Sequence, residues 1–161
     1  MPAPRTAAAL LALLSATMLI FAFAFEAFGG LRPCELCWWQ RWAWLGALPS
    51  AIAAWLAPGR LPAALLGLAA LAVLAGAGIA FFHVGVEWHW WRGTAACGAS
   101  GGAASVEELA RQLLGQPVVR CDEVAWSLFG ISMAGWNGMI ALVAGLAALA
   151  VAGRDLRRAP A

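Results

Sequence analysis

Four long apolar stretches divide the chain, and the polar positions gather in the segments between them. The stretches cover about residues 7–28, 38–56, 61–83 and 133–152. A helix needs roughly twenty apolar residues to cross about 30 Å of hydrocarbon, and each stretch has about that length. The pattern therefore predicts an all-α membrane protein, in which four transmembrane helices form a bundle in a single integral membrane domain over residues 1–161.

The links between the stretches predict how the helices are connected. Gly29, Gly30 and Pro33 interrupt the chain after the first stretch, and a very short link at residues 57–60 follows the second. Links this short make the first three helices antiparallel neighbours. Pro49 lies inside the second stretch, where a helix bundle tolerates it as a kink.

Residues 84–132 form the one long segment expected outside the membrane. They hold Cys97 and Cys121, most of the acidic residues and a glycine-rich patch at Gly98–Gly102. The sequence Ser-Val-Glu-Glu at residues 105–108 is typical of a capping box, and apolar positions recur after it at helical spacing until Gly115 and Pro117. We expect one short amphipathic helix here, lying on the membrane surface.

The composition supports a membrane protein and excludes other classes. Hydrophobic residues make up 63% of the chain and charged residues 11%, far from the roughly 45–50% and 25% of soluble domains. The net charge of +2 and the lack of a basic tract give nucleic-acid binding no support. The chain has ten Trp and no Tyr, and Trp suits the interface between lipid and water.

The first stretch has an alternative interpretation as a cleaved signal peptide. Arg5 precedes it and Ala22-Phe23-Ala24 lies near its end. The apolar stretch is longer than the 7–15 residues of a typical signal peptide, and phenylalanines crowd the possible cleavage site. We therefore expect a retained helix, with Glu26 near its far end, where the carboxylate can reach water or a partner.

The arginines suggest an orientation without deciding it. With four spans, both termini and the link at residues 57–60 share one side of the membrane. That side holds Arg5, Arg60, Arg154, Arg157 and Arg158, and the other side holds Arg32, Arg41, Arg92, Arg111 and Arg120. The counts are equal, so the positive-inside rule is only suggestive. We expect cytoplasmic termini, which puts all four cysteines on the opposite face, the periplasm in a bacterium, where disulfides persist.

Cys34 and Cys37 form a Cys-x-x-Cys pair at the expected membrane surface. Trp38 follows the pair, where a c-type haem site would need histidine. Three interpretations remain: a redox-active pair, an inert structural disulfide, or a zinc site completed by other cysteines and by His83 or His89. We favour the redox pair and expect no bound metal.

Arg41 is the physical argument for redox activity. It lies one helical turn after Cys37, so the two side chains share a helix face. A helix N-terminus and a nearby cation both favour the thiolate, which is the nucleophile. The alternative is an arginine that anchors the helix end at the membrane surface. His83 lies at the outer end of the third stretch. It could simply pair there with Glu87 or a backbone carbonyl, without a role in the chemistry.

Together these motifs resemble the disulfide bond formation protein B (DsbB) family of bacterial inner-membrane oxidoreductases, over almost the whole chain. The matching pieces are Pro33-Cys34-Glu35-Leu36-Cys37 with Gln40-Arg41, the segment from His83 to Trp91, Cys121-Asp122-Glu123, Trp126-Ser127-Leu128-Phe129-Gly130, and Trp136-Asn137. The combination is specific, although each piece alone is not. The first external link is shorter here than in the best-known members. Vitamin K epoxide reductase-like proteins also combine four helices with a Cys-x-x-Cys pair, but they carry it late in the chain.

The resemblance implies an electron path. The family oxidises a soluble thioredoxin-fold partner, DsbA, in the periplasm and passes two electrons to a membrane quinone, ubiquinone or menaquinone. Carried over by motif, Cys97 would be attacked by the partner, Cys121 would exchange with Cys34, and Cys37 would meet the quinone. Arg41 and His83 would lie at the quinone site. The competing hypothesis is a non-catalytic four-helix membrane protein with structural disulfides or a metal site.

Overall fold

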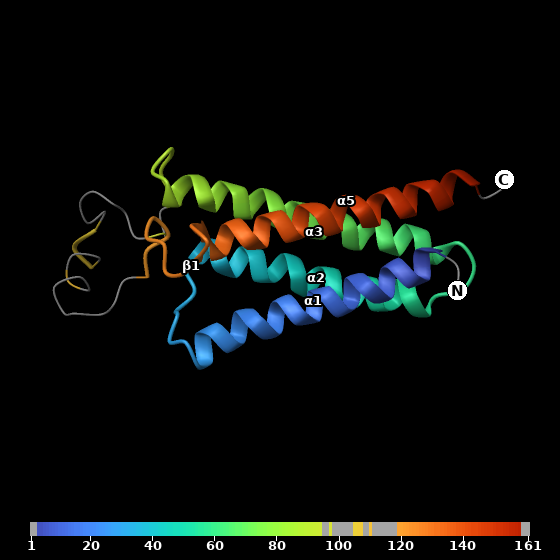
Figure 1. Ribbon diagram of the computed structural model, residues 1–161, viewed down its shortest axis with the longest axis horizontal. Coiled ribbons are helices and arrows are strands. Elements are labelled where there is room, and N and C mark those ends of the chain that lie inside the picture. The colour runs from blue at the N-terminus through green and yellow to red at the C-terminus, as the bar shows by residue number, and fades with distance from the viewer. Residues whose placement is uncertain (1–2, 95–96, 98–104, 108–109, 111–118, 159–161) are drawn as a thin grey trace.

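The computed structural model describes residues 3–94, 97, 105–107, 110 and 119–158. The long helices run side by side along the long axis of the molecule (Figure 1). They are α1 (Ala3–Ala27), α2 (Glu35–Leu56), α3 (Leu61–Glu87) and α5 (Met133–Arg158). The two chain ends and the α2–α3 link lie at one end of the bundle, and the other connections lie at the opposite end. The helices thus alternate in direction, as the short links predicted.

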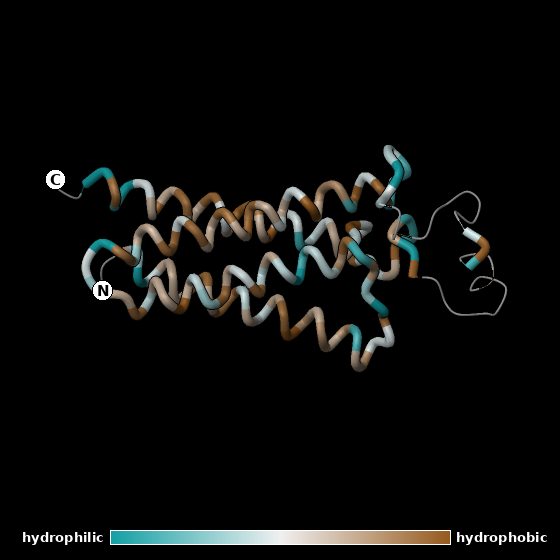
Figure 2. Tube along the Cα trace, turned by 180° about the vertical axis from the view of Figure 1, so that it is seen from behind, coloured by the Kyte–Doolittle hydropathy of each residue, from teal (hydrophilic) through white to brown (hydrophobic). Residues whose placement is uncertain are grey.

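The expected fold class is confirmed: the chain is a helical membrane protein. Within the part of the chain that the structure describes, three helices are long and apolar enough to cross a membrane, namely α1, α3 and α5. Helix α2 has 22 residues and lies in the same bundle, but its polar and tryptophan residues lower its hydropathy. Hydrophobic residues run along all four helices, while hydrophilic residues concentrate towards the two ends (Figure 2).

The helix bounds differ from the expected ones mainly at the ends. Helix α2 begins at Glu35 rather than near residue 38, so Cys34 caps the helix and Cys37 lies in its first turn. Helix α3 continues to Glu87 and α5 to Arg158, past their apolar stretches. Apolar stretches mark only the parts of a helix that face lipid or core, so polar turns at the ends were missed.

Two features of the segment before α5 stand apart from the prediction. Strands β1 (Ser127–Leu128) and β2 (Ile131–Ser132) form a small antiparallel hairpin, which the hydrophobic pattern does not predict. Phe129 and Gly130 between them have φ of 53° and 78°, as a type I′ hairpin turn requires. Of the expected amphipathic helix, Val106, Glu107 and Ala110 are helical, and its remaining residues and the Gly98–Gly102 patch lie outside the described residues.

Small residues let the helices approach closely. A Cβ added to Gly76 of α3 would come within 2.7 Å of the Ala43 Cβ on α2, and one added to Gly145 of α5 would meet Leu74 at 2.7 Å. Such close contacts replace the hydrophobic driving force, which is weak between helices in lipid. A buried cluster lies at the end of the bundle opposite the α2–α3 link and consists of Cys34, Leu36, Val86, Cys97 and Cys121. The fold therefore buries all but one of the four cysteines together.

Candidate functional site

The inner thiols sit at the start of α2. Cys34 is the N-cap residue, and its sulfur accepts a hydrogen bond from the Cys37 backbone N–H at 3.3 Å. The Cys34 and Cys37 sulfurs are 2.8 Å apart, and both cysteines are free. Cys34 is buried and Cys37 is half-buried. The Cys-x-x-Cys spacing thus becomes a direct contact because the first cysteine caps the helix whose first turn carries the second.

The outer cysteines form a disulfide. Cys97 is bonded to Cys121, and the Cys121 N–H also donates to the Cys97 carbonyl at 3.3 Å. The Thr94 hydroxyl lies 3.2 Å from the Cys97 sulfur and donates to the Glu35 carboxylate. Glu35 and Thr94 therefore tie the segment after α3 to the first turn of α2.

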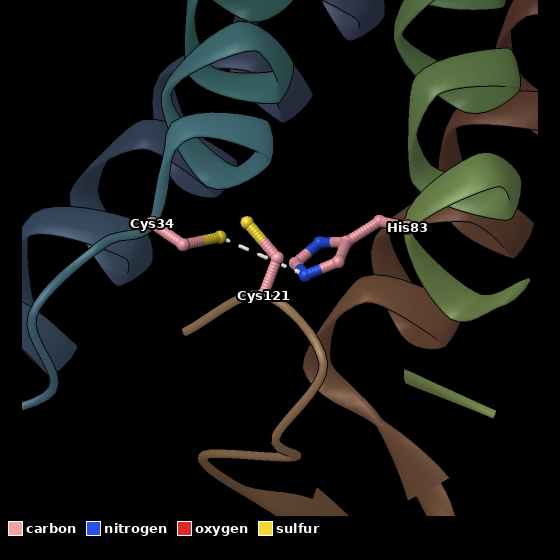
Figure 3. Close-up of side chains that lie close together, drawn as sticks. All are labelled: Cys34, His83 and Cys121. Atoms are coloured by element: carbon pink, nitrogen blue, oxygen red, sulfur yellow. Dashed lines mark hydrogen bonds between the residues drawn. The ribbon is translucent and has the colours of Figure 1, made fainter. Parts of the chain in front are cut away.

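The inner and outer pairs are neighbours. The Cys34 sulfur, the Cys121 sulfur and a His83 ring nitrogen all lie within 4.8 Å of one another (Figure 3). Cys34 comes from the start of α2, His83 from α3, and Cys121 from the segment before α5. Three separate parts of the chain thus bring a disulfide within reach of a free thiol, which is the geometry that thiol–disulfide exchange needs.

His83 is part of a buried polar network rather than a partner of Glu87. Its Nε2 lies 3.6 Å from the Cys34 sulfur, and its Nδ1 lies 3.1 Å from the Gln40 side-chain nitrogen. Gln40 in turn accepts a hydrogen bond from Asn137 of α5 at 2.7 Å. Glu87 forms a side-chain hydrogen bond with Ser132 instead. Its Oε2 is buried without a hydrogen-bond partner among the described residues.

Arg41 is buried inside the bundle. Its guanidinium donates to the Glu26 carboxylate at 2.5 Å and to the Ala22 carbonyl at 3.0 Å, both on α1. It also lies over the rings of Phe23 and Trp38, at 4.8 and 4.9 Å from their centroids. The anchoring alternative does not describe this side chain, and Glu26 has found a partner in Arg41.

A cavity of about 540 Å³ opens beside these groups. Cys34, Cys37, Arg41 and His83 line it on the side of α2 and α3. The rest of its wall is largely apolar and comes from α1, the α1–α2 link, α5 and the segment before α5, including Phe21, Phe25, Trp126, Phe129 and Ile140. A mostly apolar cleft with a few convergent polar groups is the usual form of a small-molecule site.

The two inner sulfurs are not electrostatically equivalent. The hydrogen bond to Cys37, together with burial, raises the pKa of the Cys34 thiol well above its usual range. This environment favours the neutral thiol form of Cys34. Negative charge on the pair then falls on the Cys37 sulfur, at the N-terminus of α2 and one turn from Arg41.

The zinc alternative meets an obstacle in the outer disulfide. Cys34, His83 and Cys121 are close enough to share a metal ion. However, the Cys121 sulfur is bonded to Cys97, and a cysteine binds a metal ion as the thiolate. While that bond lasts, the cluster offers only part of a zinc ligand set.

The contacts among the polar residues that hold this site together do not follow from the sequence pattern. From the sequence, Gln40 and Asn137 stand only among the motif residues of the family resemblance. Trp44 donates to Asn137 at 2.8 Å, which completes the network. A signal existed, because polar residues within apolar membrane stretches are costly and usually functional. Nothing in the sequence indicated the contact between Thr94 and Glu35.

A membrane bundle that holds a free Cys-x-x-Cys pair against a neighbouring disulfide defines a class, that of membrane thiol–disulfide oxidoreductases. The comparisons give the family. The protein-family model described as "Disulfide bond formation protein DsbB" matches residues 4–151, so the chain belongs to the DsbB family. The resemblance seen in the motifs is confirmed, and with it a role in disulfide bond formation.

One relative illustrates the similarity. The chain is 33% identical over 136 residues to the disulfide bond formation protein B of Marinobacter nauticus, covering 79% of each chain. No solved structure matches the chain.

Proposed function

We propose that the protein is a quinone-dependent thiol oxidase that reoxidises a DsbA-like, thioredoxin-fold dithiol carrier in the periplasm. The observation that carries the proposal is the contact between the two cysteine pairs. The Cys121 sulfur of the outer disulfide and the Cys34 sulfur of the inner pair lie within 4.8 Å. Electrons that enter at the outer pair can therefore reach the inner pair without a large movement of the described residues.

In the first half of the proposed reaction, the carrier reduces the outer pair. A carrier thiolate attacks the Cys97 sulfur, and the electron pair of the disulfide leaves with Cys121. The second carrier thiolate then attacks the mixed disulfide and releases Cys97. The carrier has lost two electrons and forms a disulfide, while Cys97 and Cys121 are left reduced.

In the second half, the outer pair reduces the inner pair. Cys121 attacks Cys34 in a Cys34–Cys37 disulfide, and Cys37 leaves as the thiolate. Cys97 then attacks Cys121 in the new mixed disulfide, which releases Cys34. The products are a bonded outer pair and two free inner thiols, the same arrangement that the described residues adopt.

The cavity beside Cys37 fits a quinone. Its volume of about 540 Å³ lies within the range of typical ligand sites, and its wall is aromatic and aliphatic as a flat apolar ring requires. Arg41 would donate a hydrogen bond to the carbonyl end of ubiquinone or menaquinone, and His83 would lie beside the ring as part of the cavity wall. When bound, the quinone supplies an acceptor for two electrons and two protons from the inner thiols.

We place the protein in the bacterial inner membrane, as a multi-pass protein with cytoplasmic termini and periplasmic cysteines. The chain ends gather at one end of the bundle and the connections that carry the cysteines at the other (Figure 1). Helix α2 would cross the membrane together with α1, α3 and α5. Its buried Gln40 and Arg41 face partners within the bundle, which compensates for their cost in lipid.

The test is a reconstituted assay with purified protein, a ubiquinone analogue and a reduced thioredoxin-fold partner. We expect quinone reduction that depends on the partner. Cys37→Ser should abolish it, and normal turnover by this variant would overturn the mechanism. Arg41→Ala should raise the KM for quinone more than it lowers kcat.

A matched control separates the two halves of the path. The double variant Cys97→Ser/Cys121→Ser keeps the inner pair and the cavity. It should still reduce quinone when a small dithiol replaces the partner, but it should fail with the partner itself. Equal turnover with both reductants would show that the outer pair is not an electron entry point.

A further inference from the structure

A chain of hydrogen bonds connects α5 and α2 to the Cys34 sulfur through buried side chains. The Trp44 indole N–H donates to the Asn137 oxygen at 2.8 Å, and the Asn137 nitrogen donates to the Gln40 oxygen at 2.7 Å. The Gln40 nitrogen lies 3.1 Å from His83 Nδ1, and His83 Nε2 lies 3.6 Å from the Cys34 sulfur. The function proposed above assigns no role to Trp44, Asn137 or Gln40.

The donor-to-acceptor direction along these hydrogen bonds follows from Trp44. An indole N–H only donates, so Asn137 must turn its oxygen towards Trp44 and its nitrogen towards Gln40. Gln40 must then turn its oxygen towards Asn137. Its nitrogen is left to donate to the Leu36 carbonyl at 3.1 Å and to His83. Each amide orientation is therefore set by its neighbour.

The same logic determines the His83 tautomer. Because Gln40 donates to Nδ1, that nitrogen must keep its lone pair. The neutral ring then carries its proton on Nε2, the nitrogen that faces the Cys34 sulfur. The ring also forms a hydrogen bond with the backbone of Cys121.

We propose that Gln40, oriented by Asn137 and Trp44, is a positioning residue that keeps the His83 proton on Nε2 and directs it at the Cys34 sulfur. This deepens the proposed function and rests on it for its catalytic meaning. The tautomer itself is a property of the protein without quinone or partner, so it is tested independently.

The consequence is a stabilised leaving group. When the Cys34–Cys121 mixed disulfide is cleaved by a thiolate that bonds to Cys121, the electron pair of the broken bond goes to Cys34. Two donors meet that charge: His83 Nε2–H and the Cys37 backbone N–H at 3.3 Å. The ring keeps its proton, since a neutral imidazole is a weaker acid than a thiol. A proton on Nε2 also leaves this nitrogen without a lone pair for a metal ion.

The first experiment determines the tautomer by NMR on ¹⁵N-histidine-labelled protein. The chain has two histidines, and His89→Asn leaves His83 as the only one. Asn suits this position because His89 has a φ of 59°, which asparagine tolerates. A one-bond ¹⁵N–¹H correlation at Nε2 is expected. A proton on Nδ1 would overturn the proposal.

The matched variant is Gln40→Glu, which keeps the shape but replaces the donor with an acceptor. The carboxylate should attract a proton to His83 Nδ1, so the correlation should appear at that nitrogen. Gln40→Met, similar in length but without polar groups, should give a mixture of tautomers. If both variants have the same thermal stability as the parent and still carry the His83 proton on Nε2 alone, Gln40 does not set the tautomer.

The second experiment measures the chemistry of Cys34. The double variant Cys37→Ser/Cys97→Ser traps the Cys34–Cys121 mixed disulfide, and a small dithiol releases Cys34. Gln40→Glu should slow this release about tenfold, the effect of losing one hydrogen bond to a charged group. His83→Leu should slow it by a similar factor, and the two changes together should cost little more. Additive losses would indicate a merely structural role for Gln40.

The outcomes separate this proposal from the proposed function. If the parent protein did not reduce quinone, the proposed thiol oxidase function would be wrong, but the His83 tautomer could still be measured. A proton on Nδ1, with normal quinone reduction, would sink only the role of Gln40.

Discussion

At the scale of single residues, Arg41 is a positive charge inside the bundle that Glu26 compensates. Its side chain is 8% exposed, while that of Glu26 is 36% exposed. The ion pair and the Ala22 carbonyl hold the guanidinium against α1, at the wall of the cavity. An arginine that anchored the helix at the membrane surface would extend to water instead.

Removal of Glu26 should leave this charge without its partner. We expect Glu26→Ala to lower the free energy of unfolding by about 1–2 kcal/mol, less than for a fully buried pair because Glu26 is partly exposed. Thermal unfolding in detergent measures the change. The double variant Glu26→Ala/Arg41→Met should recover part of the loss, and a Glu26→Ala protein as stable as the parent would contradict the ion pair.

The two inner thiols should differ in their reaction with iodoacetamide. The hydrogen bond to Cys37 and burial raise the pKa of Cys34. At pH values below that pKa, the fraction of Cys34 present as thiolate rises about tenfold for each unit of increasing pH. Its initial alkylation rate should keep rising with pH beyond about 8.5, the ordinary thiol value. Peptide mass spectrometry at low conversion reads both sites. A plateau of the Cys34 rate near pH 8.5 would show that burial only limits access.

At the scale of elements, the N-terminus of α2 organises the site. Cys34 caps the helix, Cys37 lies in its first turn and Arg41 follows one turn later. Helix α3 adds His83 and lies close against α2 at Gly76, where a side chain larger than hydrogen has no space. The position of His83 relative to the thiols therefore depends on this close approach.

Gly76→Ala should push α2 and α3 apart. The added Cβ would lie 2.7 Å from the Ala43 Cβ, and overpacking of this kind costs about 1–3 kcal/mol. Gly78→Ala is the matched control, because an added Cβ there meets nothing within 4 Å. We expect a lower Tm for Gly76→Ala only. Equal Tm values for the two variants would mean that the helices are not in close contact at Gly76.

At the scale of the whole molecule, the bundle has two chemically different ends. One end holds the chain ends and the α2–α3 link, and the other holds the hairpin (Figures 1 and 2). The buried cysteines and the cavity lie at the hairpin end, since Leu128 and Phe129 of the hairpin line the cavity together with Cys34 and Cys37. Because alternate connections lie at opposite ends, one crossing helix fewer would put the two chain ends on different sides of the membrane.

Topology reporters test this arrangement in cells. Alkaline phosphatase fused after Arg60 or after Arg158 should be inactive, since both points lie at the cytoplasmic end in our proposal. The same reporter fused after Trp91 should be active, and a fluorescent protein should give the opposite pattern. An active fusion after Arg60 would show that α2 does not cross.

The sequence by itself determined the long helices and the family, and it supplied the cysteine motifs from which the candidate site is proposed. Apolar stretches of membrane length leave the chain few other solutions in lipid, and the cysteine motifs are local in sequence. The tertiary structure alone decided which groups meet. The contacts of Cys121 with Cys34, of Glu26 with Arg41 and of Asn137 with Gln40 join different parts of the chain. Such pairings follow from how the helices rotate and pack, which hydropathy along the chain does not specify.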